Sequence, residues 1–159
     1  MPPLHPAFVH FPIGLIVFSF ITDLLGRLSN RPSFRAAGFW SLIGALLGGA
    51  IAATTGYFDF GRDALAETAR YADFHQDVGY VLVGAVIVLT LWRWLVYGRR
   101  DLSPGYLYLF AALLVMGLTL FQAWYGGEMV YSQGAGVAAA NKGTEPSAIG
   151  KQRLDKVTR

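Results

Sequence analysis

The chain has 159 residues, of which 54% are hydrophobic and only 14% are charged, and its mean hydropathy is +0.43. A soluble domain of this length is more polar, so the composition favours a membrane protein. The chain has no cysteine, which excludes disulfides, thiolate metal ligands, c-type haem attachment and cysteine nucleophiles. The net charge of +3 comes from residues 141–159, with five basic and two acidic side chains, so it does not indicate nucleic acid binding.

Four apolar stretches approach or reach the length that crosses a membrane. They run from Phe8 to Leu28, Ala36 to Phe58, Val78 to Leu95 and Tyr106 to Trp124. A helix needs about 20 mainly apolar residues to cross a hydrocarbon core of ~30 Å. The rest of the chain is too small to surround four such helices with protein. We therefore predict an all-α fold, a four-transmembrane-helix up-and-down bundle over residues 1–140, followed by a basic, flexible C-terminal tail over residues 141–159.

Two features of the first two spans have alternative interpretations. Asp23 and Arg27 are four residues apart at the end of the first span, a spacing that favours an ion pair. The alternative is a role of Asp23 in moving protons. The second span is rich in glycine, which lets transmembrane helices approach closely or, alternatively, leaves room beside a flat cofactor. These glycines are Gly38, Gly44, Gly48, Gly49 and Gly56.

The loops predict the orientation. Arginines occupy the link between the first two spans and the end of the third span, whereas the segment between the second and third spans is mainly acidic. Short arginine-rich loops stay in the cytoplasm, so both termini should lie outside. In the acidic loop, Asp63 to Arg70 predicts a short surface helix, with Leu65, Ala69 and Ala72 at helical spacing, which would cover the histidines described next.

All three histidines, His5, His10 and His75, precede spans that start on the same side of such a bundle, and Asp59 and Glu128 lie near that boundary. Imidazole binds transition metals and haem iron. We expect His10 and His75, on diagonal spans, to hold haem b through its iron. Alternatively, His5, His10, His75 and Glu128 bind zinc or copper. Asp59 and Glu128 would then orient the metal-bound imidazoles. A third possibility is a structural subunit whose histidines bond to loop backbone.

The run His5-Pro6-Ala7-Phe8-Val9-His10-Phe11-Pro12-Ile13-Gly14 resembles the opening signature of a bacterial membrane family, the domain of unknown function 2231. The segments Gly56 to Asp59 and Gly126 to Tyr131, with His75 between them, fit the same pattern over about residues 4–137. The resemblance implies a multi-pass protein of the bacterial inner membrane, whose relatives are sometimes joined to cytochrome-type modules. It implies no settled activity.

Together these features predict an integral membrane protein that carries electrons through haem b, with metal-ion binding and a structural role as the alternatives. The expected partners are the lipid bilayer and other subunits of a membrane redox complex, photosynthetic or respiratory. No residue is assigned a catalytic role, and we expect that the chain is not an enzyme by itself.

Overall fold

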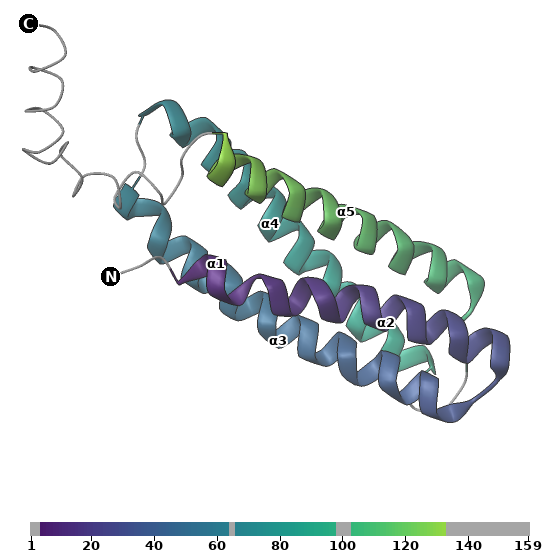
Figure 1. Ribbon diagram of the computed structural model, residues 1–159. Coiled ribbons are helices and arrows are strands. Elements are labelled where there is room, and N and C mark those ends of the chain that lie inside the picture. Colours follow the sequence, from purple (N-terminus) through teal and green to yellow (C-terminus); the bar gives the residue numbers. More distant parts are fainter. Residues whose placement is uncertain (1–3, 64–65, 98–102, 133–159) are drawn as a thin grey trace, which may run out of the picture.

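The computed structural model describes residues 4–63, 66–97 and 103–132, and the side chains of these ranges outside residues 60–69. Its helices are α1 (His5–Phe8), α2 (His10–Ser29), α3 (Pro32–Asp63), α4 (Ala66–Trp92), the π-helix η1 (Arg93–Tyr97) and α5 (Tyr106–Tyr131). Four helical segments are long and apolar enough to cross a membrane. The predicted all-α, four-span fold is therefore confirmed (Figure 1).

The long helices run alternately up and down. α2 packs against α3 and α5, and α4 packs against the same two helices, so α2 and α4 are diagonal neighbours (Figure 1). The short helix α1 leads into α2 and also packs against α3. The starts of α1 and α4 and the ends of α3 and α5 lie together at what we call the histidine end, which contains His5 and His75. The opposite end, with Arg27, Arg35 and Arg93, is called the arginine end.

Close packing of α2 on α3 explains Gly44 and Gly48 of the second span. The buried residues of α2 include Pro12, Ile16, Ser19, Asp23 and Gly26. Their spacing alternates between four and three, as in a left-handed coiled coil. On the facing helix α3, a Cβ added at Gly44 would lie 2.9 Å from the Leu15 side chain, and one at Gly48 would lie 3.2 Å from the Phe11 ring. The space beside these two glycines is thus filled by α2, which favours the close-packing interpretation.

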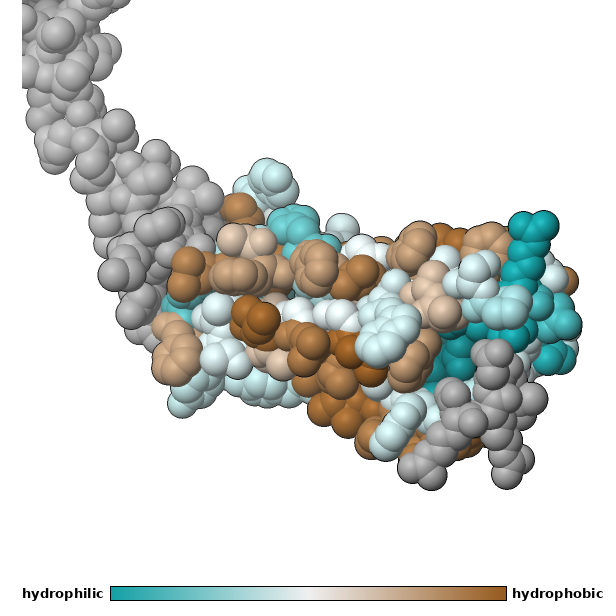
Figure 2. All heavy atoms as spheres, turned by 90° about the horizontal axis from the view of Figure 1, so that it is seen from below, coloured by the Kyte–Doolittle hydropathy of each residue, from teal (hydrophilic) through white to brown (hydrophobic). Residues whose placement is uncertain are grey.

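The middle of the bundle is apolar. Its core consists of Ile16, Leu42, Ala45, Val86, Leu89, Tyr108, Leu109 and Ala112. Large apolar side chains also cover the outside, including Trp40, Leu47 and Leu107, each more than 60% exposed. Figure 2 shows this hydrophobic surface along the bundle and hydrophilic side chains gathered at the arginine end. An apolar outer surface of this kind suits a bundle surrounded by lipid.

The surface helix expected near Asp63 to Arg70 is not a separate element. α3 continues to Asp63 and α4 begins at Ala66, so this helical sequence extends the two spans. Extending an existing helix needs no new nucleus and is easier than starting a short one. Leu65 and the tail over residues 141–159 lie outside the described residues, as do the side chains of Glu67 and Ala69.

Candidate functional site

His5 is fixed by contacts to α3. The backbone N–H groups of Leu4 and His5 donate to Oδ2 of Asp59, at 2.7 and 2.8 Å, so Asp59 caps the first turn of α1. The Nδ1 atom of His5 lies 2.7 Å from the carbonyl oxygen of Ala52. A carbonyl only accepts, so Nδ1 carries a proton, and in the neutral ring the lone pair is then on Nε2. A Cβ at Gly56 would lie 2.9 Å from this Nδ1, so the contact needs glycine there.

His75 reaches the same place from α4. The ring centroids of His5 and His75 are 6.0 Å apart, with planes at 86°. The ring of Tyr125 stacks on His75, with centroids 6.2 Å apart and an angle of 13°. A Cβ at Gly126 would lie 2.9 Å from Cε1 of His75. Together, His5, Gly56, His75, Tyr125 and Gly126 form what we call the histidine cluster, to which α1, α3, α4 and α5 all contribute.

Two buried polar atoms beside this cluster have no hydrogen-bond partner among the described residues. They are Nδ1 of His75 and Oε1 of Gln122. Gln122 is held in place because its Nε2 donates to the backbone oxygen of His75, at 2.6 Å. Buried polar atoms are normally paired, and an exception calls for an explanation. The histidine cluster therefore differs from a set of fully bonded core histidines.

His10 and Glu128, the other two predicted metal ligands, have different hydrogen-bond partners. His10 is exposed on α2, and its Nδ1 lies 3.0 Å from the carbonyl oxygen of Pro6. Five residues separate it from His5, or about 140° around a helix, so the two rings cannot share one face. Glu128 is exposed and accepts a hydrogen bond from Ser132. Within residues 4–63, 66–97 and 103–132, no group of three or more His, Asp or Glu side chains is arranged to hold a metal ion. The structure thus brings His5, not His10, against His75.

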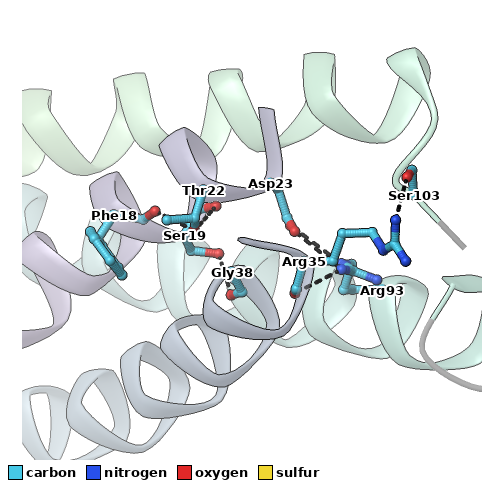
Figure 3. A network of polar contacts seen from close by, with 8 residues as sticks. All are labelled: Phe18, Ser19, Thr22, Asp23, Arg35, Gly38, Arg93 and Ser103. Carbon is cyan, nitrogen blue, oxygen red and sulfur yellow. Dashed lines mark hydrogen bonds and ion pairs between the residues drawn. The ribbon is translucent and has the colours of Figure 1, made fainter. Parts of the chain in front are cut away.

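A second polar cluster crosses the bundle at the arginine end (Figure 3). The Nε and Nη2 atoms of Arg93 donate to Asp23, at 3.3 and 3.1 Å. The two side chains are only 3% and 1% exposed. Arg93 also donates to the backbone oxygen of Arg35, at 3.2 Å. The ion pair joins the diagonal helices α2 and α4, because Arg93 begins the π-helix that follows α4.

The predicted pair of Asp23 with Arg27 is wrong. The carboxylate of Asp23 faces the bundle interior and pairs with Arg93, whereas the guanidinium of Arg27 lies 4.8 Å from the ring centroid of Tyr106. Spacing along one helix could not reveal a partner from the diagonal helix. The available signal was that Arg93 is the one charged residue in the predicted span from Val78 to Leu95.

Neighbouring polar groups complete the arginine end. Ser19 donates to the backbone oxygen of Gly38, at 2.8 Å, and a Cβ at Gly38 would overlap the carboxylate of Asp23. Arg35 donates to Oδ1 of Asn30 and to Oγ of Ser103, at 3.0 and 3.3 Å. These bonds tie the turn between α2 and α3 to the residues before α5, so this cluster holds the helices together.

These observations define a four-span integral membrane protein with paired imidazoles at one end and a buried ion pair at the other. The family model described as "Predicted membrane protein (DUF2231)" matches residues 1–139, and the chain belongs to this family. No curated protein and no solved structure matches the chain. The family match confirms the resemblance found in the sequence.

Proposed function

We propose that this membrane protein holds one transition-metal ion, copper, between the imidazoles of His5 and His75, and that the ion carries electrons. The spacing of the two rings is the observation on which the proposal rests. With metal–nitrogen bonds of about 2.0–2.1 Å and ring centres about 1.1 Å behind each nitrogen, one ion in line between two imidazoles separates their centroids by ~6.3 Å. The separation in the structure is 6.0 Å.

The hydrogen bonding of the two rings supports the same proposal. Metal-binding histidines usually give their second nitrogen to a carbonyl or carboxylate, which fixes the tautomer. His5 does this with the carbonyl of Ala52, and its Nε2 lone pair remains for an ion. His75 has a buried Nδ1 without a partner in the described part of the chain, and a bound ion would satisfy it.

Copper suits this ligand set better than zinc. Structural zinc sites take four protein ligands and catalytic ones take three. The histidine cluster offers two imidazoles, and Asp59, which caps α1 at His5, already accepts two backbone hydrogen bonds. Imidazole is a good copper ligand, and copper heads the affinity order of the divalent metals.

Haem b is the second candidate, because its two axial imidazoles would have a similar spacing. A porphyrin also needs a wide slot between those imidazoles. Four of the five second-span glycines that could have provided space are covered, Gly44 and Gly48 by α2, Gly56 by His5 and Gly38 by Asp23, and Gly49 alone of the five has open space beside it. A single ion needs no such slot, so we rank it first.

Metal content and visible absorption of the purified full chain test the proposal. We expect one copper ion per chain in the wild type and in His10→Gln, and at least tenfold weaker copper binding in His5→Gln and His75→Gln. Equal copper retention in all four proteins, or none in the wild type, would overturn the copper site. A Soret band that disappears in His5→Gln and His75→Gln, but not in His10→Gln, would assign the same pair to haem iron instead.

Two neighbouring glycines give a matched test that leaves both ligands in place. A Cβ at Gly126 would lie 2.9 Å from the His75 ring, whereas one at Gly127 has no neighbour within 4 Å. Gly126→Ala should therefore weaken copper binding, and Gly127→Ala should not. The opposite ranking would show that the position of His75 does not control the site.

For the cellular setting, we propose a multi-pass protein of the bacterial inner membrane, with both termini and the histidine cluster on the periplasmic side. Arg27 and Arg31 at the α2–α3 turn, together with the Arg99-Arg100 pair that follows η1 in the sequence, support this orientation. Electron carriers act between other proteins, so further subunits of a membrane redox complex are the proposed partners. The chain itself would then not be an enzyme.

A further inference from the structure

We propose that the arginine end binds the headgroup of an anionic phospholipid, at the boundary between α2 and α5 beside Arg27. Among the described residues of this end, basic side chains outnumber acidic ones. Asp23 is the one acidic side chain in its described part, and it is buried and bonded to Arg93. Arg27 is half-buried and Arg31 is exposed, and within the described residues neither forms an ion pair, so their positive charge can attract an anion.

Arg27 is held in a position suited to a phosphate. Its guanidinium carbon lies 4.8 Å from the ring centroid of Tyr106, the first residue of α5. Tyr106 is 67% exposed, as expected for a tyrosine at the bilayer boundary. A guanidinium carries five N–H groups, and contact with one aromatic ring leaves some of them for an anion. Those N–H groups can bind two oxygens of one phosphate.

The surroundings of Arg27 suit a lipid rather than a free phosphate ion. Leu28, the next residue, is 68% exposed, and Leu107, next to Tyr106, is 71% exposed. Exposed leucines from both helices thus adjoin the charged group. Figure 2 shows the hydrophilic surface of this end meeting the hydrophobic surface of the bundle. A phospholipid could satisfy both surfaces, with its phosphate on Arg27 and its acyl chains on the leucines.

Lipid binding to the full chain tests this site independently of the metal proposal. In detergent micelles, the protein is titrated with phosphatidylglycerol or phosphatidylcholine, and retained lipid is counted by native mass spectrometry. A basic residue near a membrane surface contributes enough that Arg27→Gln should weaken phosphatidylglycerol binding roughly fivefold. Arg27→Lys keeps the charge but not the paired N–H groups, so its affinity should fall in between. Arg70→Gln, exposed at the histidine end, is the control and should bind as the wild type does.

Several results would overturn the proposal. The wild type would bind the two lipids equally, or Arg27→Gln and Arg70→Gln would lose the same amount of phosphatidylglycerol binding. A third contradicting result is that millimolar inorganic phosphate displaces all of the bound lipid. The last result would indicate a free-anion site. Thermal unfolding of each variant shows whether the fold is kept. If Arg27→Gln does not fold, Tyr106→Leu, which removes the ring under Arg27, must weaken phosphatidylglycerol binding for the proposal to stand.

Discussion

Replacing Asp23 by alanine should strongly destabilise the bundle. The change leaves the guanidinium of Arg93, which is 3% exposed, without its carboxylate, while the backbone oxygen of Arg35 still accepts one of its hydrogen bonds. Removing one partner of a buried ion pair costs about 3–5 kcal/mol of unfolding free energy, because the other charge stays buried. Asp73 is exposed at the histidine end, and Asp73→Ala should change the same free energy by less than about 0.5 kcal/mol.

The free energy of unfolding can be measured from helix loss as the mole fraction of sodium dodecyl sulfate in mixed micelles is raised. The double variant Asp23→Leu with Arg93→Leu removes both charges, so it should recover most of the stability lost in Asp23→Ala. An Asp23→Ala protein within about 1 kcal/mol of the wild type would refute the reasoning, since only exposed pairs contribute so little. A double variant as unstable as the single one would show that packing, not charge, explains the loss.

Two further predictions concern packing and topology. Gly38→Ala should destabilise the bundle by about 1–3 kcal/mol in the same assay, because its Cβ would overlap Asp23. A Cβ at Gly49 on the same helix would have no neighbour within 4 Å, so Gly49→Ala should leave the free energy of unfolding unchanged. Equal losses of unfolding free energy in Gly38→Ala and Gly49→Ala would contradict the packing of α2 on α3. The chain lacks cysteine, and a membrane-impermeant thiol reagent added outside should label Ser132→Cys but not Ser29→Cys. Reversed labelling would place the histidine cluster in the cytoplasm.

The fold was predictable because the bilayer imposes strict requirements. Four apolar stretches in a chain of 159 residues leave few other arrangements, and the four spans are confirmed. Element ends were less predictable. α3 extends to Asp63 and α4 starts at Ala66, beyond the apolar stretches, because helix propagation does not stop where hydrophobicity does.

The sites were predictable only in part. The sequence indicated which end of the bundle gathers the histidines, since spans of an up-and-down bundle alternate in direction. It did not indicate which histidine faces inward, because that depends on the rotation of α1 and on the contact of His5 with Ala52. In the same way, Asp23 was assigned a partner four residues away, whereas packing brings Arg93 to it from the diagonal helix. Contacts between distant helices depend on helix rotation, which local spacing does not encode.

The most direct test of the central proposal is X-ray absorption at the copper edge on the copper-loaded full chain. Two imidazole nitrogens at about 2.0 Å from the metal should dominate the wild-type spectrum. The imidazole contribution should fall to one ring in His75→Gln and stay at two in His10→Gln. A wild-type spectrum without imidazole scattering, or one that His75→Gln leaves unchanged, would contradict metal binding between His5 and His75.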